Sequence, residues 1–220
     1  MDAMTKAALK VLYQRLGLWG ALHIIVRVIR GKMTGAPFAG WPKAQQRRER
    51  ESRQQLGPAI LVYRALLKRY SPSHSLLVTS DVVTASGRAF LNQVLSELDI
   101  DHLISLPNDQ RSAYLTPILS PIPNALFELS FDTENKVRFT VKSCRFVGLC
   151  AELGHPELAP LFCAVDDHFF RHDLPQVNLE RATTIAHGGE QCPFILSLST
   201  ESTASSTAMT AASVDPSKLN

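Results

Sequence analysis

The hydrophobic pattern of this 220-residue chain changes from a helical to an alternating period near residue 125, and that change limits the folds available to it. Over residues 9–29 and 60–70 apolar side chains recur at three- and four-residue steps, which is typical of helices. Over residues 126–141 apolar and polar residues alternate, with turn-forming residues at 132–135, and this predicts a β-hairpin. We therefore expect an α+β fold, in which a helical N-terminal half packs on a small antiparallel sheet.

The first expected helix carries one apolar stripe with basic residues on its flanks. A stripe of this kind either packs on the core of its own domain or lies on an anionic membrane surface. We favour the core, and a peripheral membrane contact is the alternative. The stripe consists of Leu9, Leu12, Leu16, Trp19, Leu22, Ile25, Val26 and Ile29.

Two more helices and a proline-rich stretch complete the first half. Residues 35–42 break the first helix, and a second begins near Pro42, because proline suits the first helical position. Ser80 or Asp81 is expected to cap a third helix that runs to about Leu98. Residues 105–124 contain four prolines. We interpret them as an irregular loop of the kind that often forms a lid or pocket wall.

The second half is expected to hold two helices between two strand pairs. One helix runs over 144–153 and stops at Gly154, and the next runs from Pro156 to about residue 170. Residues 177–185 and 192–198 form the second strand pair. Residues 1–198 then make one domain, and the Ser-, Thr- and Ala-rich residues 199–220 are a disordered tail.

Charge is unevenly placed, although the formal net charge is only +3. Residues 1–70 hold 14 Lys and Arg against 3 Asp and Glu, or +11, and the remainder is therefore −8. The basic half lacks a nucleic-acid docking motif and interleaved aromatic residues, so no nucleic-acid partner is expected. The phosphate-loop, GxGxxG and GxSxG patterns are also absent, and we predict no cofactor.

The start of the chain does not resemble a secretory signal, and no apolar run reaches the length of a membrane span. The four cysteines are then expected to be reduced thiols in a cytoplasmic protein. The sequence leaves the oligomeric state open, a homodimer included.

Residues 144–192 concentrate the groups that can carry chemistry. In a helix, Cys163 lies one turn before Asp166 and Asp167, so that a nucleophile and an acid or base share a face. A buried cysteine that acts only as a small hydrophobe is the competing interpretation. His168 and His172 stand four residues apart, but spacing fixes no third ligand, and we predict no metal site.

Five segments in order resemble the L-2-amino-thiazoline-4-carboxylic acid hydrolase family. The resemblance covers about 125–198 and implies an α+β small-molecule enzyme with an apolar pocket between helices and sheet. It implies hydrolytic opening of a cyclic amidine at the carbon of its C=N bond. The segments are 142–146 (KSCRF), 152–158 (ELGHPEL), 163–166 (CAVD), 181–184 (RATT) and 187–194 (HGGEQCPF).

The resemblance also assigns residues by position. Cys144, Cys163, Asp166 and Cys192 match recurring Cys and Asp positions and are the candidate catalytic residues. Arg181 and Thr184 match a strand motif and are the candidate substrate-binding residues, because arginine can hold a substrate carboxylate bidentately.

One departure from the family pattern keeps other functions open. Pro193 stands where the family has an acidic residue after the last cysteine. The main hypothesis is a C–N hydrolase in which Cys163 or Cys192 attacks, or Asp166 activates water. The alternatives are a non-hydrolytic cyclase or isomerase of secondary metabolism, pericyclic cyclisation included, and a non-catalytic module that binds a hydrophobic ligand.

Overall fold

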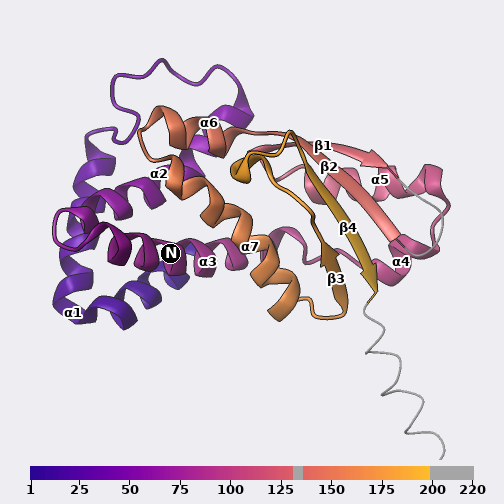
Figure 1. The fold of residues 1–220 in the computed structure, drawn as a ribbon, viewed down its shortest axis with the longest axis horizontal. Helices are drawn as coiled ribbons and strands as arrows, with labels where there is room; N and C mark the ends of the chain where they lie inside the picture. The colour runs from indigo at the N-terminus through magenta and orange to yellow at the C-terminus, as the bar shows by residue number, and fades with distance from the viewer. Residues whose placement is uncertain (131–135, 199–220) are drawn as a thin grey trace, which may run out of the picture.

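Three long helices form one end of the molecule, and a four-stranded sheet with two short helices forms the other (Figure 1). The structure is a computed structural model that describes residues 1–130 and 136–198. Within these residues the α+β class is confirmed. The predicted tail, 199–220, and the turn of the hairpin lie outside the described residues.

Helix α1 (Ala3–Met33) is two helical segments that meet at Gly17. Gly17 has φ 67° and ψ 178°, a conformation that is costly for any residue with a Cβ. The apolar stripe divides there: Leu12 is buried at 3 % exposure, whereas Trp19 is 78 % exposed. After Gly17 the helix buries Gly20, Ala21 and Ile24 instead. The expected core role was therefore wrong for the exposed stripe residues Trp19, Leu22, Val26 and Ile29.

Helices α2 (Arg47–Leu67) and α3 (Pro72–Val94) pack against α1 and against each other. The second helix begins later than the expected start near Pro42. The third begins earlier than expected, so the cap predicted at Ser80 or Asp81 was wrong. Ser71 is the cap: its hydroxyl accepts from the His74 backbone N–H, and Pro72 fits the first turn.

The proline-rich stretch is helical, which corrects the expected loop. It contains part of α4 (Ile100–Ser105) and all of α5 (Asn108–Leu119). Three of its four prolines flank α5, and only Pro117 lies inside, in the last turn. The side chain of Arg111, which is 7 % exposed, donates to the carbonyl oxygens of Ile104 and Leu106. It thereby satisfies acceptors at the end of α4.

The sheet is antiparallel with strand order β1-β2-β4-β3. Strands β1 (Ala125–Ser130) and β2 (Lys136–Cys144) form the predicted hairpin pair. Strands β3 (Val177–Glu180) and β4 (Cys192–Leu198) form the second predicted pair. Strand β3 ends earlier than expected, and Ile185–His187 is instead a short 3-10 turn, η2.

Two helices connect the strand pairs, as predicted. Helix α6 (Arg145–Glu152) is followed by Gly154 at φ 78°, the left-handed conformation that commonly ends a helix. A 3-10 turn, η1 (Pro156–Leu158), then leads into α7 (Ala159–His172). Helix α7 packs on α3, so the second half of the chain closes onto the first.

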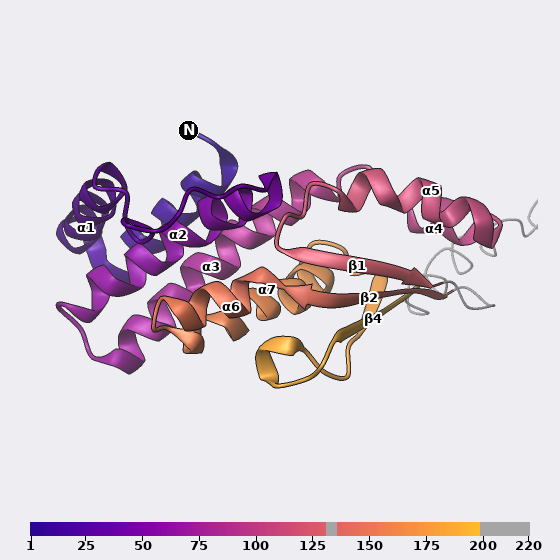
Figure 2. The same ribbon diagram turned by 90° about the horizontal axis from the view of Figure 1, so that it is seen from above.

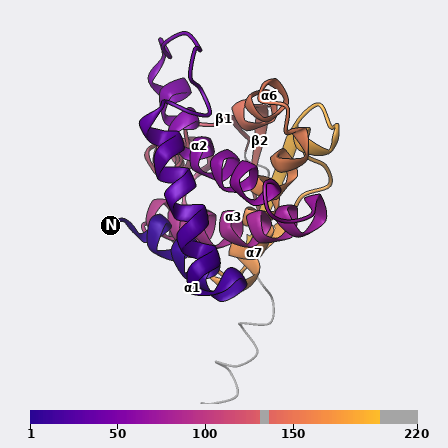
Figure 3. The same ribbon diagram turned by 90° about the vertical axis from the view of Figure 1, so that its left-hand side faces the viewer.

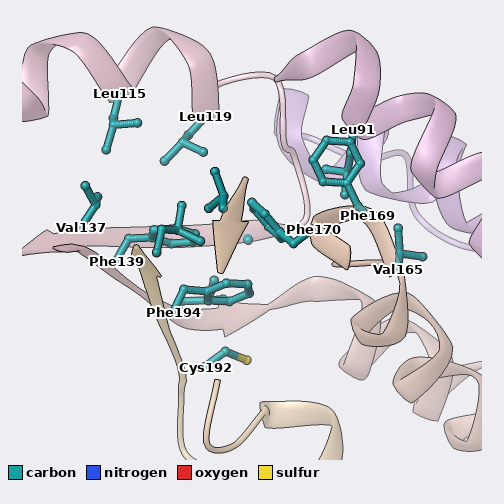
Figure 4. Close-up of a cluster of buried hydrophobic side chains, with 14 of the residues drawn as sticks. Leu91, Leu115, Leu119, Val137, Phe139, Val165, Phe169, Phe170, Cys192 and Phe194 are labelled. Atoms are coloured by element: carbon teal, nitrogen blue, oxygen red, sulfur yellow. The ribbon is translucent and has the colours of Figure 1, made fainter. Parts of the chain in front are cut away.

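One face of the sheet is covered by helices. Alternate residues of β2 are buried, and the buried set faces α5, α7 and the end of α3 (Figures 2 and 4). Leu115 and Leu119 of α5 point toward the sheet, and the rings of Phe139 and Phe194 stack with centroids 4.6 Å apart. Among the described residues, no helix is long and apolar enough to cross a membrane.

Candidate functional site

A cavity of about 840 Å³ lies between the covered face of the sheet and the helices. Its walls are mostly apolar. Helix α5, from the proline-rich stretch, supplies part of the wall through Leu115, Ile118 and Leu119. The polar residues of its lining include Asn124, Asp166 and Arg181.

Arg181 joins the segment after β3 to α7. Its Nη1 donates to Asp166 Oδ2 at 2.7 Å, and its Nη2 donates to Asp167 Oδ2 at 2.8 Å and to the Cys163 carbonyl oxygen at 2.9 Å. The guanidinium also lies 5.1 Å from the ring centroid of Phe194, within the range of a cation–π contact. These contacts hold the side chain at 6 % exposure, with both neighbouring carboxylates engaged.

Asp166 is the partly desolvated acid of this cluster. Its side chain is 27 % exposed and borders the cavity. Burial raises the pKa of the carboxyl from 3.8 to about 6, and the charge of Arg181 opposes that rise. A carboxyl with a pKa in this range can exchange a proton near neutral pH.

Cys163 lies one turn before Asp166 on α7 and also borders the cavity. Burial raises the pKa of its thiol to about 11, and the Thr184 hydroxyl acts in the opposite direction. Because only the thiolate is strongly nucleophilic, Cys163 is protonated and weakly reactive at neutral pH.

Cys192 opens β4, the strand that also carries Phe194 (Figure 4), and lines the same cavity. Its Sγ accepts from the Ile185 backbone N–H at 3.2 Å, and burial raises its pKa. Cys144, at the end of β2, also lines the cavity, where its Sγ lies 3.9 Å from Asn124 Nδ2. All four cysteines of the chain are free thiols.

Thr184 is close to the cluster but does not line the cavity. It is 5 % exposed, and its hydroxyl lies 2.7 Å from His187 Nδ1. The fold thus brings five of the six predicted site residues to the cavity wall: Cys144, Cys163, Asp166, Arg181 and Cys192. Their catalytic and binding roles stay predictions.

Sequence reasoning missed two neighbours of this cluster. Asn124 is the last residue of the proline-rich stretch and meets Cys144 through the bulged start of the β1–β2 pair. Phe194 lies two residues after Cys192 on β4. Because alternate residues of a strand face the same side, this spacing was the signal that both side chains face inward.

Strand β4 also shows how the fold accommodates Pro193. The proline pairs with Thr140 of β2, whereas β3 pairs with β4 only from Ile195 to Leu198. Pro193 therefore lies where β4 has a neighbour on one side, the setting in which a strand tolerates proline.

A comparison with protein-family models decides the family. The model of the L-2-amino-thiazoline-4-carboxylic acid hydrolase family matches residues 49–196, well over half of the chain. The chain belongs to this family. The match begins in the first turn of α2, so α3 and almost all of α2 lie inside the matched residues, whereas α1 lies before them.

Two further comparisons, with curated proteins and with solved structures, add no close relative of this family member. A sequence comparison with curated proteins finds no match. Among solved structures, the NMR structure of the SO2144 H-NOX domain from Shewanella oneidensis in the Fe(II)CO state is 17 % identical. It covers 91 % of this chain and 99 % of that one, with a TM-score of 0.39. The crystal structure of an H-NOX protein from S. oneidensis in the Fe(II)NO state is 16 % identical, covering 90 % and 99 %, with a TM-score of 0.36.

Metal binding was considered for the two histidines near the end of α7. The rings of His168 and His172 have centroids 6.0 Å apart. In the part of the chain that the structure describes, no group of three or more His, Cys, Asp or Glu could hold a metal ion.

Proposed function

We propose that this chain is a hydrolase that opens a cyclic C=N-containing substrate whose apolar part fills the cavity. The observation that carries the proposal is the partly desolvated carboxyl of Asp166, paired with Arg181, at the wall of a largely apolar cavity of about 840 Å³. Family membership supports the hydrolytic class.

In this proposal Asp166 acts as the general base. Arg181 holds Oδ2, and Oδ1 accepts a proton from water. The water oxygen adds to the carbon of the C=N bond. The π electron pair of that bond moves to the nitrogen, which takes the proton back from Asp166. The added hydroxyl then becomes a carbonyl as the bond from this carbon to a ring heteroatom breaks, and Asp166 carries the hydroxyl proton to the departing heteroatom. General-base assistance of this kind contributes about 10²–10⁴-fold to a rate.

The thiols have a different role in the proposal. With a pKa of about 11, Cys163 is not an effective nucleophile at neutral pH. We infer that it lines the wall as a neutral thiol, so that the carboxylate route is favoured over thiol attack. Reduced thiols beside the substrate fit the cytoplasmic location expected from the sequence.

The experiment compares ring opening of 2-aminothiazoline-4-carboxylate with that of 2-aminothiazolines bearing longer apolar substituents. Reactions run in ¹⁸O-labelled water, and mass spectrometry follows incorporation of the label. We expect the apolar substrates to be preferred. We also expect Asp166→Asn to lose about 10²-fold or more of turnover.

Asp167→Asn is the matched control, because Asp167 also binds Arg181 but does not line the cavity. It should keep most of the activity, as should Cys163→Ser. Loss of turnover in Cys163→Ser with retention in Asp166→Asn would replace the carboxylate route with thiol attack. Retention in both variants would rule out Asp166 and Cys163 as the catalytic groups and would leave thiol attack by Cys192.

The size and apolarity of the cavity favour a second candidate, a non-hydrolytic cyclase or isomerase of secondary metabolism. A shaped apolar cavity can accelerate cyclisation by orienting its substrate, with few ionisable groups. Its product has the mass of its substrate and carries no ¹⁸O. Saturable binding without any product would instead indicate a ligand-binding module.

A further inference from the structure

We propose that the second half of α1 docks on an anionic lipid bilayer and places an opening of the cavity at the membrane surface. The docking face consists of six exposed apolar side chains. Their exposed fractions range from 39 % at Val26 to 82 % at Met33. The set is Leu18, Trp19, Leu22, Val26, Ile29 and Met33.

These six residues form one continuous stripe. At 3.6 residues per turn they fall within an arc of about 100° on the helix after Gly17. The opposite side of the same helix buries Ala21 and Ile24 against the protein. Figure 3 shows α1 in front of the rest of the chain, and the exposed fractions of its six members place the stripe on the solvent side of this helix. An exposed apolar stripe of this extent marks an interaction surface.

A basic groove of about 330 Å³ borders one side of the docking face. It lies between α1 and α2 and is lined by Arg27, Arg30, Arg64 and Lys68, together with His23. The side chain of Arg27 donates to His23 Nε2, and that of Arg64 donates to the Leu153 carbonyl oxygen. None of the eight lining residues, all in the described part of the chain, is acidic.

The other side of the docking face meets the cavity. Ile29 belongs to the stripe and also lines the cavity. Lys32, one turn later on α1, lines the cavity too. Since Ile29 is 51 % exposed, the cavity reaches the surface beside the stripe. An apolar molecule dissolved in the bilayer could therefore enter the cavity without crossing water.

Charge decides between a bilayer and a second copy of the chain. The sequence has no acidic residue between Asp2 and Glu49, and cations lie on both flanks of the docking face. In a two-fold dimer through this face, Arg27, Arg30 and Lys32 would approach the same cations of the partner. An anionic bilayer instead offers phosphate groups to the basic groove and an apolar layer to the stripe.

The experiment uses the whole chain with Trp41→Phe, which leaves Trp19 as its sole tryptophan. We expect Trp19 emission to shift to shorter wavelength with vesicles containing about 30 % phosphatidylserine, but not with phosphatidylcholine alone. Raising salt from about 0.05 M to 0.5 M should weaken binding, because counterions screen the basic groove.

Variants in the same background test the two parts of the surface. Arg27→Gln and Arg30→Gln should each weaken vesicle binding about fivefold, whereas Arg171→Gln, at the exposed end of α7, should not. Leu22→Ser with Ile29→Ser should abolish the shift. Leu77→Ser, which alters an equally exposed leucine on α3, should leave it unchanged.

Three results would overturn the proposal. One is absence of anionic-vesicle binding at low salt. Another is binding that survives both the Leu22→Ser/Ile29→Ser and the arginine changes. The third is self-association, seen by sedimentation without lipid, that Leu22→Ser/Ile29→Ser abolishes, because the face would then belong to a second copy.

Discussion

Arg181 Nη1 donates to Asp166 Oδ2 at 2.7 Å, and this pair ties the segment after β3 to α7 at the wall of the cavity. The pair sets the proton affinity of the proposed base, because burial raises the pKa of Asp166 while Arg181 lowers it.

Removing the guanidinium should therefore raise the pKa of Asp166 above its value of about 6. We expect Arg181→Gln to move the carboxyl ¹³C NMR titration of Asp166 to higher pH, and the acid limb of turnover with it. Arg181→Lys keeps a positive charge and should produce a smaller rise. An unchanged titration in Arg181→Gln would show that the charge does not act on Asp166.

Asp166 should also make stability depend on pH. Its folded-state pKa of about 6 exceeds the ordinary value of 3.8, so the folded state binds the proton more tightly than the unfolded state. The resulting contribution to the free energy of unfolding amounts to about 3 kcal/mol at most. It is present below pH 3.8 and is lost as pH rises through about 6.

Denaturant titrations of the wild type and Asp166→Asn over this pH range measure the effect. The free energy of unfolding of the wild type should fall relative to that of the variant as pH rises. The slope carries the prediction, because loss of the Arg181 contact adds only an offset. Parallel curves for the two proteins would contradict it.

The contact between α3 and α7 depends on the absence of a side chain at Gly87. A Cβ there would lie 2.6 Å from Val165 Cγ1 and 2.7 Å from Cγ2, and Val165 is buried. Gly87→Ala should lower the free energy of unfolding by about 1–3 kcal/mol, measured by thermal or urea denaturation.

Gly148→Ala in α6 is the matched control. A Cβ at Gly148 meets nothing within 4 Å, so alanine should raise stability by about 0.5–1 kcal/mol through helix propensity. Equal effects of the two alanines would mean that the packing at Gly87 is not the cause.

Alkylation should show that Cys163 is a protonated thiol. With a pKa of about 11, roughly one molecule in several thousand carries the thiolate near neutral pH. Iodoacetamide labelling, followed by peptide mass spectrometry, should be far slower than in the urea-unfolded chain and rise about tenfold per pH unit. Cys150, whose pKa is raised to about 12, should react more slowly still. Labelling of Cys163 as fast as in the unfolded chain would contradict the burial argument.

Local patterns predicted most of the elements. The alternation over 126–141 indicated the hairpin, and Gly154 marked the end of α6. The prediction of a loop over 105–124 was wrong because proline is unfavourable only inside a helix. Three of the four prolines flank α5, and the Arg111 side chain donates to a carbonyl oxygen at the end of α4. The predicted start of α3 was wrong because Ser71, which caps a helix as well as Ser80 or Asp81 would, lies earlier in the chain.

By itself, the sequence determined the fold class, the order of most elements and the segment that carries the thiols and Asp166, since periodicity and capping act over a few neighbouring residues. Only the tertiary structure decided which face of α1 is buried, because Gly17 redirects that helix between two otherwise similar apolar runs. The tertiary structure also decided the protonation of the site residues. The proton affinities of Asp166 and Cys163 depend on burial and on Arg181, and residues distant in sequence create both when the sheet closes against the helices.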